Sequence, residues 1–375
     1  MPGTHTGKIY LDYNASTPVD PAVAKVMRGF LEDTWGNPSS DHWAGVPARE
    51  AVERARAQVA GLPGCKPGEI VFTSGGSEAN NLAIKGLLHG RPDAHIITTQ
   101  IEHPAIVEPC RFLEGQGAQI TWLSVDAAGQ VDPGDLRRAI RANTTLISIM
   151  HANSEAGSIQ PIAECARIAR ENDILFHTDA AQTVGKIATN VNDLGVDLLS
   201  IAGHKLYAPK GIGALYVRDG VELEPLIHGA GHESGRRAGT ESAMLTAALG
   251  KACELAGDLS AMARVRALRD RFWSLLQDAL GDRVVLNGHP EQRLPNTLHV
   301  SFMGHVGAEI LAAIPEIAAS TGSACHTGLI EMSPVLKAMG MSTERGAGAV
   351  RFSLGRFTTK TDIENAAELI IRHLD

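Results

Sequence analysis

The sequence predicts an α/β protein, with a mainly parallel seven-stranded sheet in a large domain and a smaller α/β domain beside it. Short β-rich runs alternate with amphipathic segments between residues 70 and 217, which is typical of strands joined by helices. The chain also has 375 residues, more than a single hydrophobic core usually organises, so two domains are expected.

The large domain is expected to hold seven strands with helices between them. The predicted strands are residues 70–73, 95–99, 119–124, 146–151, 174–177, 197–201 and 214–217. Amphipathic periodicity predicts helices that include residues 78–89, 132–142 and 162–172. In sheets of this kind ligands bind outside the carboxyl ends of the strands, so the residues that follow each strand are the first candidates for a site.

The second part of the chain repeats an α/β pattern on a smaller scale. A long helical stretch is expected over residues 243–280, followed by a strand at 298–302, a helix at 308–314, a strand at 348–354 and a helix from Thr361. We predict a large domain of residues 16–257. The small domain then combines residues 1–15 with residues 258–375 and carries a loop that contains Cys325.

Composition excludes several classes of protein. Hydrophobic residues make up 44% and charged residues 20%, and the net charge of −8 argues against nucleic-acid binding, which needs clustered Lys and Arg. No apolar run approaches the roughly 18 residues of a membrane span, and the N-terminus has no apolar signal core, so a soluble cytoplasmic protein is expected. The five cysteines are widely spaced without a Cys-x-x-Cys pair, which indicates neither a disulfide framework nor a metal site.

An aspartate and a lysine follow two neighbouring strands of the predicted sheet. Asp179 comes just after the apolar run 174–176, and Lys205 comes just after the strand-like residues 196–201. Pyridoxal phosphate (PLP) needs a lysine that forms a Schiff base and an acid that keeps its ring nitrogen protonated. A salt bridge at the strand ends is the alternative for such a pair taken alone.

A glycine turn between a strand and a helix supplies a candidate anion site. Gly76 and Ser77 stand where the helix begins, so free backbone amides and a hydroxyl meet there. His204, beside Lys205, is a further candidate contact to a phosphate. An ordinary turn with a serine cap is the alternative.

Two polar residues near these strand ends suit the same cofactor. His103 could stack on a flat ring and move protons, because the pKa of an unperturbed histidine lies near neutrality. Gln182, three residues past Asp179, could donate a hydrogen bond to the phenolic oxygen of the cofactor. A purely structural histidine is the alternative at position 103.

Cys325 and Arg351 are the candidates for reaction and recognition in the second part of the chain. Cys325 lies in a run of small residues, 319–328, which favours an exposed nucleophile on a mobile loop, with His326 as a nearby base. Arg351 lies in a predicted strand, where its guanidinium group could bind an amino-acid carboxylate through two parallel hydrogen bonds. A surface ion pair is the alternative for this arginine.

Taken together, these motifs resemble the cysteine desulfurase family, PLP enzymes of the class-V aminotransferase type with the fold called type I. The resemblance extends over nearly the whole chain, with motifs at residues 10–18, 35–40, 73–81, 102–103, 151–157, 177–182, 203–205, 235–241, 323–325 and 351–359.

The resemblance implies a role for each matching residue. Lys205 would form the Schiff base, and His103 would stack on the ring and move protons. Cys325 would be the nucleophile that becomes a persulfide. Residues implied to bind the cofactor or substrate are Asp179 at the ring nitrogen, Gln182 at the ring oxygen, Gly76, Ser77 and His204 at the phosphate, Thr240 from the second subunit of a homodimer, Asn153 and Ser154 near the ring, and Asn14 and Arg351 at the substrate.

The chain departs from the family pattern in three places. Ala202 stands where a phosphate-binding serine is often found, and Ser154, beside Asn153, stands where an asparagine often lies near the ring. The chain ends at Asp375, about a helix short of relatives that dock an iron–sulfur scaffold protein, so that docking surface is expected to be missing.

The predicted function is that of a homodimeric PLP enzyme that converts L-cysteine to L-alanine and passes sulfur from Cys325 to an acceptor protein. Cys325-His326, followed by residues 333–336, also resembles selenocysteine lyases, which share the fold and the cofactor. A further alternative is another PLP enzyme of the same fold, such as an aminotransferase or decarboxylase. Such an enzyme would have no need of Cys325. The last alternative is a non-catalytic protein that only positions a sulfur acceptor.

Overall fold

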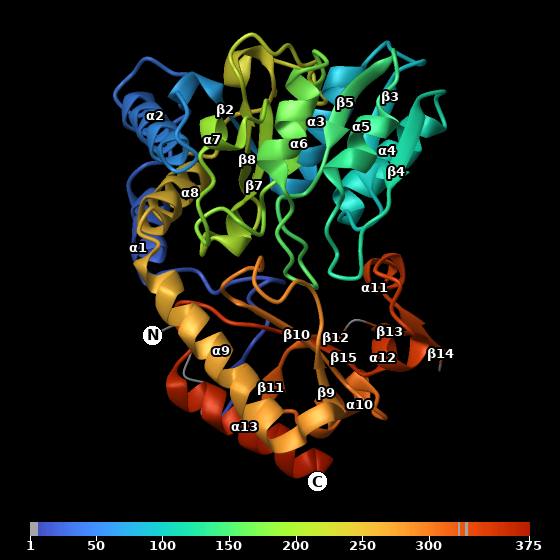
Figure 1. The fold of residues 1–375 in the computed structure, drawn as a ribbon. Coiled ribbons are helices and arrows are strands. Elements are labelled where there is room, and N and C mark those ends of the chain that lie inside the picture. Colours follow the sequence, from blue (N-terminus) through green and yellow to red (C-terminus); the bar gives the residue numbers. More distant parts are fainter. Residues whose placement is uncertain (1–6, 322, 327–328) are drawn as a thin grey trace.

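The computed structural model describes residues 7–321, 323–326 and 329–375, which form two layered parts (Figure 1). The first part is built on a seven-stranded sheet in the order β2-β8-β7-β6-β5-β3-β4. Neighbouring strands are parallel except where β8 pairs with β2 and β7. The predicted mainly parallel seven-stranded sheet is confirmed. Its strands are β2 (Ile70–Thr73), β3 (His95–Thr99), β4 (Gln119–Leu123), β5 (Thr144–Ser148), β6 (Leu175–Asp179), β7 (Leu198–Ala202) and β8 (Gly213–Val217).

Alternating residues of these strands belong to two hydrophobic cores, one on each face. Leu199 and Ile201 pack into one core, whereas Leu198 of the same strand packs into the other. Because side chains of a strand point alternately to opposite faces, a strand buried on both sides reads as a continuous apolar run. Helices α3 (Gly76–Leu88) and α4 (Pro104–Glu114) cover one face. The other is covered by α1 (Pro21–Glu32), α2 (Gly45–Gly61), α5 (Pro133–Ala139), α6 (Ile162–Arg170), α7 (Val191–Leu194) and α8 (Ala243–Ala256).

Two predicted strands are displaced along the chain. β5 begins at Thr144 and ends at Ser148, so residues 149–151 lie past the strand. β6 extends to Asp179, two residues beyond the predicted end of the strand at residue 177, so Asp179 is its last residue. Pairing with β7 is the physical reason, since Asp179 lies opposite Ser200.

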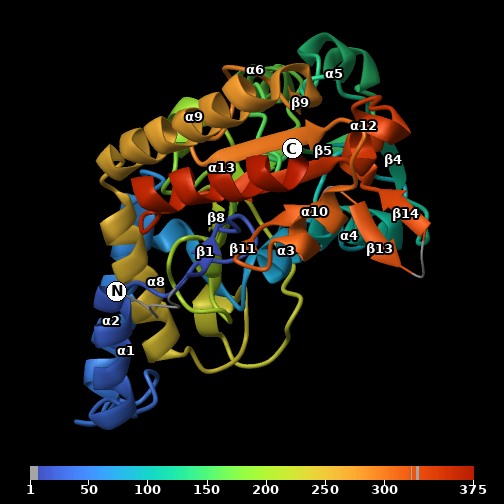
Figure 2. The same ribbon diagram turned by 90° about the horizontal axis from the view of Figure 1, so that it is seen from below.

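The second part is a four-stranded antiparallel sheet in the order β12-β15-β10-β9. Its strands are β9 (Val284–Leu286), β10 (Thr297–Phe302), β12 (Ser320–Thr321) and β15 (Ala349–Ser353). Helices α9 (Ser260–Leu280) and α13 (Lys360–Leu374) run side by side across it (Figure 2). The predicted helix over residues 243–280 is thus two helices, because α8 ends at its C-cap Gly257.

The N-terminal residues join this second part. β1 (Ile9–Tyr10) pairs in parallel with β11 (Ile317–Ala318), and Asp12 bridges to Ser353. The shorter helices α10 (Gly307–Ala313), α11 (Pro334–Ala338) and α12 (Thr343–Ala347) complete this part. We propose the domain boundary at residues 257 and 258, which fall between α8 and α9.

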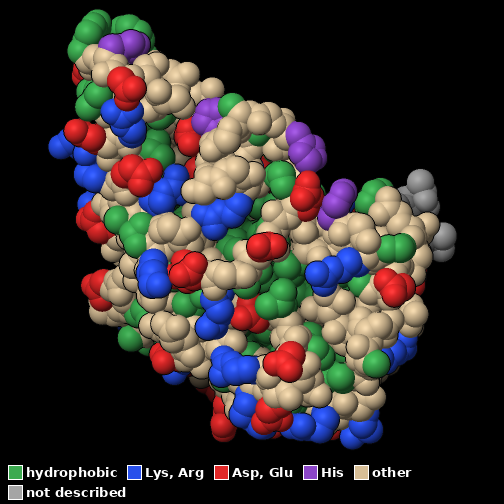
Figure 3. Space-filling model, turned by 90° about the horizontal axis from the view of Figure 1, so that it is seen from above, with side chains coloured by type: hydrophobic (Ala, Val, Ile, Leu, Met, Phe, Trp, Pro, Cys, Tyr) green, Lys and Arg blue, Asp and Glu red, His purple; other side chains and the backbone are tan. Residues whose placement is uncertain are grey.

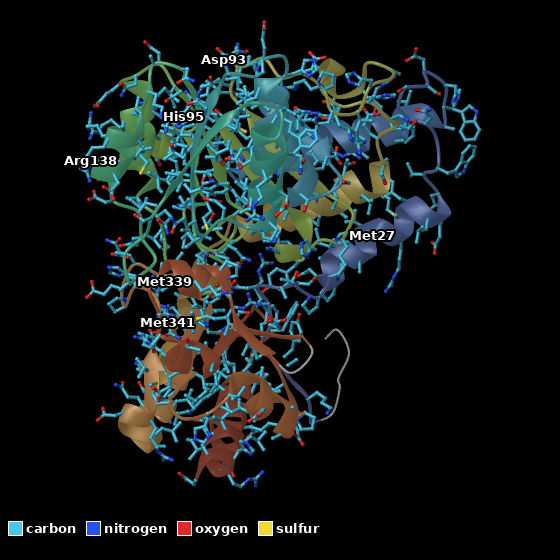
Figure 4. All side chains as sticks on the ribbon, turned by 90° about the vertical axis from the view of Figure 1, so that its right-hand side faces the viewer. Met27, Asp93, His95, Arg138, Met339 and Met341 are labelled. Atoms are coloured by element: carbon cyan, nitrogen blue, oxygen red, sulfur yellow. The ribbon has the colours of Figure 1, made fainter. Side chains whose placement is uncertain are left out.

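A small hydrophobic cluster connects the two parts. Leu336 and Met339 pack with Ile101 and Met150, residues that follow strands of the large sheet. Met339 and Met341 lie at the level where the two parts meet (Figure 4). The segment that follows the Cys325 region is therefore anchored against the large sheet.

The backbone around Cys325 corrects one prediction. β13 (Ser323–His326) pairs antiparallel with β14 (Leu329–Met332), and Cys325 lies opposite Ile330, so the expected irregular loop is a strand at this point. Pairing satisfies backbone groups that a loop would leave without partners. An isolated two-stranded hairpin is only marginally stable, however, which distinguishes it from a strand inside a large sheet.

No helix in the described part of the chain is long and apolar enough to cross a membrane. The face seen in Figure 3 carries Lys and Arg side chains interspersed with Asp and Glu, without a large patch of one sign.

Candidate active site

A cavity of about 580 Å³ opens where β6 and β7 end. Both parts of the chain line it. Arg351 reaches the cavity from β15 of the second sheet, and Asn14 reaches it from the N-terminal segment that joins this sheet. Of the residues predicted from the sequence, those that line the cavity are Asn14, Gly76, Ser77, His103, Ser154, Asp179, Gln182, His204, Lys205 and Arg351.

Lys205 reaches the cavity from a short turn, Gly203–Lys205, directly after β7. Burial lowers the pKa of its amine, the nearby Arg351 lowers it further, and Asp179 opposes the shift. A lowered pKa leaves a larger fraction of the amine unprotonated and nucleophilic near neutrality.

Asp179 is held at the end of β6 by two hydrogen bonds. Its Oδ2 accepts from Asn80 Nδ2 at 2.7 Å, and its Oδ1 accepts from the backbone N–H of Ala181 at 2.9 Å. Asp179 as a whole is 8% exposed, and these bonds fix the orientation of its carboxyl group in the cavity lining. Sequence reasoning missed Asn80. A polar residue on the otherwise apolar face of α3 was the signal that could have identified it.

The first turn of α3 forms an anion-binding corner of the cavity. Gly75, the N-cap, has φ of 155° and places no side chain over the helix end, which has no side-chain cap. A Cβ on Gly76 would lie 3.1 Å from the Cβ of Ala202, so the turn packs closely on the end of β7. Ser77 and Lys210 line the same cavity. An uncapped helix N-terminus of this kind favours a phosphate group.

His204 closes this corner on the side of the N-terminal segment. Its Nδ1 lies 3.3 Å from Ser16 Oγ, and burial, assisted by Lys205 and Lys210, lowers its pKa to about 4. A neutral imidazole can accept or donate a hydrogen bond without adding charge. Ser16 and Lys210 are cavity residues that the sequence analysis did not single out.

His103 is the N-cap of α4. Its Nδ1 accepts a hydrogen bond from Ala105 N at 3.0 Å, which leaves the proton of the neutral ring on Nε2. Burial is the main cause that lowers the pKa of His103, and Lys205 adds to it, while Asp179 opposes. The neutral ring lines the cavity and is suited to stacking and to proton transfer.

Gln182 belongs to a buried network that the sequence analysis did not foresee. Its Nε2 donates to the backbone oxygen of Asn14 at 3.0 Å. Lys186 Nζ donates to Gln182 Oε1 at 2.9 Å and to Asn14 Oδ1 at 3.2 Å. Burial, then Lys205 and Arg351, hold the pKa of Lys186 well below its ordinary value. The network fixes the Gln182 amide so that one of its N–H groups remains for the cavity.

Arg351 is held in β15 by three acceptors. Its Nη2 donates to Asp12 Oδ1 at 2.7 Å and to Ser320 Oγ at 2.9 Å, and its Nη1 donates to Ser154 O at 3.0 Å. Nε is buried and has no hydrogen-bond partner among the described residues. With 9% of Arg351 exposed, a surface ion pair is excluded, although the pair with Asp12 exists.

Two predicted residues lie outside the cavity, and a third is not described. Asn153 does not line the cavity; its Oδ1 caps the turn at Glu155 and Ala156, so its position does not favour a cofactor contact. Thr240 is exposed and does not line the cavity of its own chain. The side chain of Cys325 lies outside the described part of the structure.

The family of this chain follows from a match over almost its whole length. A family model described as aminotransferase class-V matches residues 9–366. The chain belongs to the class-V aminotransferase family. Cysteine desulfurase IscS of Dictyoglomus turgidum is 47% identical over 374 residues, covering 98% of this chain and 95% of that protein. The protein of the same name from Pectobacterium carotovorum is 46% identical over 371 residues, covering 96% of this chain and 91% of that one.

Solved structures of this class-V family agree with the fold. A NifS-like protein superposes with a TM-score of 0.91 at 36% identity, covering 98% of this chain and 99% of that one. A structure described as "SspA in complex with cysteine" gives a TM-score of 0.84 at 39% identity, covering 94% of this chain and 100% of that one. Membership of the cysteine desulfurases, as the sequence indicated, is confirmed, and the enzyme depends on PLP.

The cavity of this class-V enzyme fits PLP by the chemistry of its donors. The uncapped start of α3 suits the phosphate, Asp179 suits a protonated ring nitrogen, and the amine of Lys205 suits the aldehyde. Gly76 eases this fit, since a side chain there would press on Ala202. Ala202 itself offers no hydroxyl, so the phosphate corner depends on helix amides and on neighbours such as His204.

Proposed function

We propose that the chain removes sulfur from L-cysteine, releases L-alanine and leaves the sulfur as a persulfide on Cys325. The observation that carries this proposal is the meeting of Lys205, Asp179 and Arg351 in the lining of one cavity. An amine, an acid and a carboxylate anchor are what a PLP enzyme needs to act on an amino acid.

The residues divide the work between binding and proton transfer. When bound, PLP withdraws electrons from the amino-acid carbon. Asp179 would keep the ring nitrogen protonated, and Gly76, Ser77 and His204 would hold the phosphate. Gln182 would donate to the ring oxygen with the N–H group that the Asn14 and Lys186 network leaves free.

Substrate recognition and proton transfer are assigned to different residues of the cavity lining. Arg351 would bind the substrate carboxylate, and Asn14 and Ser154, which hydrogen-bond through Ser154 O, would shape that end. The Lys205 amine and the Nε2 of His103 would take a proton from the substrate and return one to its carbon.

Cys325 would carry out the sulfur transfer. Its thiolate attacks the substrate sulfur, so a sulfur–sulfur bond forms while the carbon–sulfur bond breaks. The electron pair of that bond stays with the carbon, which takes up a proton and becomes the methyl group of alanine. The other cysteines are unsuited, because burial raises the pKa of each thiol to about 12: Cys65, Cys110, Cys165 and Cys253.

We also propose a homodimer in the cytoplasm, with a sulfur-acceptor protein as partner. Thr240 is exposed on the surface of its own chain. A residue that reaches the phosphate of a second subunit has to be exposed in this way. Its loop is held in place by Glu233, which accepts from Arg56 at 2.7 Å and from Phe72 N at 2.9 Å. Thr240→Ala in one subunit of a mixed dimer should weaken PLP binding at the opposite site only.

The test measures alanine release from L-cysteine together with the visible spectrum of the holoenzyme. Lys205→Ala should abolish both turnover and the normal cofactor absorbance. Cys325→Ser should keep the absorbance and lose turnover, whereas turnover that survives Cys325→Ser would favour a different PLP enzyme of this fold. L-Selenocysteine as a second substrate separates the desulfurase from a selenocysteine lyase, which would strongly prefer it.

A further inference from the structure

The turn that carries Lys205 is followed by a strained residue. Tyr207 has φ of 64°, a left-handed backbone conformation that bulky side chains rarely adopt. Such a conformation persists only where the surrounding structure holds it. Since Tyr207 stands two residues after Lys205, the contacts that hold Tyr207 also affect how the lysine is delivered to the cavity.

Contacts from both parts of the protein hold Tyr207. Its carbonyl oxygen accepts a hydrogen bond from Asp20 N at 3.0 Å. Its hydroxyl oxygen accepts from Arg356 N at 2.7 Å, and the Arg356 guanidinium lies over its ring, 4.5 Å from the ring centre. Its buried backbone N–H donates to Thr17 Oγ1 at 2.9 Å. Of these contacts, the one to Thr17 is made on the side of Tyr207 that leads back to Lys205.

Thr17 joins the residues on either side of Lys205. Its Oγ1 accepts from Tyr207 N and donates to His204 O, both at 2.9 Å, and its backbone N–H donates to the same carbonyl oxygen at 2.9 Å. One hydroxyl therefore connects the carbonyl group before Lys205 to the N–H group two residues after it. Thr17 is 6% exposed and is not among the described residues that line the cavity, so it is placed to act on the lysine through the backbone of the turn.

Loss of the Thr17 hydroxyl would leave the buried N–H of Tyr207 without its acceptor. A buried unpaired N–H is costly, and so is the left-handed conformation. Both costs fall if the peptide group between Leu206 and Tyr207 rotates, because Tyr207 then leaves the left-handed region. This rotation moves the backbone next to Lys205, whereas His204 O keeps its bond to the backbone N–H of residue 17.

We propose that Thr17 is a positioning residue, whose hydroxyl holds Lys205 in the orientation needed to react with PLP. The Lys205 nitrogen adds to the aldehyde carbon, a C=N bond forms and the aldehyde oxygen leaves as water. The nitrogen has to approach this carbon closely and from the correct direction, so a displaced turn slows the reaction. This inference rests on the proposed function, in which Lys205 forms the Schiff base.

Binding of two cofactor forms to the apoenzyme tests the inference. PLP reacts with Lys205, whereas pyridoxamine 5′-phosphate has the same ring and phosphate but no aldehyde. Thr17→Val keeps the size of the side chain and removes the hydroxyl. With saturating PLP, this variant should form the visible Schiff-base band about tenfold more slowly, the factor that one hydrogen bond supports. Its affinity for pyridoxamine 5′-phosphate, measured by calorimetry, should be unchanged, because His204 stays held by the backbone of residue 17.

Two further variants at position 17 separate positioning from general stability. Thr17→Ser keeps the hydroxyl and should form the band at the wild-type rate. Thr17→Cys offers a thiol, which is a weak acceptor, and should form the band at an intermediate rate. It also provides the comparison if Thr17→Val does not fold. A variant that merely damages the fold would lose affinity for both cofactor forms.

The inference is wrong if Thr17→Val and Thr17→Cys form the Schiff-base band at the wild-type rate. It is equally wrong if Thr17→Val loses affinity for pyridoxamine 5′-phosphate by the factor that it loses in rate, or if Thr17→Ser behaves as Thr17→Val does. A protein that shows the expected dependence on Thr17 but releases no alanine from L-cysteine would contradict the proposed function alone. A band that persists in Lys205→Ala would contradict the role of Lys205, and the inference with it.

Discussion

At the scale of single residues, the site depends on neighbouring residues whose hydrogen bonds fix the orientation of each reactive group. Asp179 faces the cavity because Asn80, on the first turns of α3, donates to its Oδ2 at 2.7 Å. The other amide atom of that side chain, Oδ1, is buried without a partner in the described structure. Asn80 is therefore retained at some cost, which indicates a role in orienting the carboxyl group.

Asn80→Ala is expected to weaken PLP binding about tenfold, because it leaves one oxygen of a buried carboxyl group without its donor, at a cost of roughly 1–3 kcal/mol. Titration of the apoenzyme with PLP, followed by absorbance, measures the change. Asn81→Ala is the matched control, since Asn81 donates to the backbone oxygen of Ser77 on the exposed side of the same helix. Equal affinities in the two variants would contradict the role of Asn80.

At the scale of single residues, the sequence predicted those cavity residues whose position is set by the end of a strand. Asp179, Lys205, Gly76 and Ser77 were found because parallel strands deliver their carboxyl ends to one edge. The partners Asn80 and Lys186, and the Asp12 contact of Arg351, depend on tertiary packing between distant segments. Local pattern carries no information about such pairs.

At the scale of elements, the phosphate corner depends on how closely β8 approaches the turn before α3. A Cβ on Gly213, at the start of β8, would lie 2.6 Å from Ile201 O and 2.7 Å from the carbonyl carbon of Gly75. Both are backbone atoms, so neither can move aside as a side chain would. β7, β8 and the turn are packed here as one unit.

Gly213→Ala is therefore expected to displace the turn at Gly75, lower the melting temperature by several degrees and weaken PLP binding at least tenfold, as overpacking costs about 1–3 kcal/mol. Gly29→Ala is the control, because Gly29 lies in α1 with nothing within 4 Å of a Cβ, and this change should be neutral or stabilising. Calorimetry and PLP titration measure both effects. Unchanged PLP affinity in Gly213→Ala would contradict the packing argument.

Element prediction from the sequence was accurate for the buried sheet and failed at the Cys325 hairpin. Short β-rich runs that alternate with amphipathic segments located all seven strands, including the partly exposed edge strand β4. β13 and β14 have neither an apolar run nor a clear alternation. Their pairing comes from backbone hydrogen bonds between two short segments, which composition does not indicate.

At the scale of the whole molecule, several buried histidines make stability depend on pH. Burial lowers the pKa of His177 and His151 to about 4, and that of His299 to about 3. His177 is enclosed in the sheet between Ser148 Oγ and Ser200 Oγ, at 2.9 and 3.0 Å. These histidines remain neutral in the folded protein at a pH where the unfolded chain would protonate them.

The sign of the effect follows from proton uptake. Between an unfolded pKa near 6.5 and a folded pKa near 4, the unfolded chain binds more protons, so the free energy of unfolding falls as pH falls. Each such histidine contributes up to about 1.4 kcal/mol per pH unit. Glu102 acts in the opposite direction: burial raises its pKa to about 8, so its contribution to stability is lost as pH rises from about 4.5 through 8.

The melting temperature of the holoenzyme is accordingly expected to fall between pH 7 and pH 5, where the buried histidines act together and outweigh the opposite effect of Glu102. His177→Asn removes one titrating group from the centre of the sheet and should make this fall shallower, whatever it does to the melting temperature at pH 7. His373→Asn, at the exposed end of α13, is the control and should leave the slope unchanged. Scanning calorimetry at half-unit pH steps measures the slopes, and equal slopes for wild type and His177→Asn would show that His177 is not held neutral by the fold.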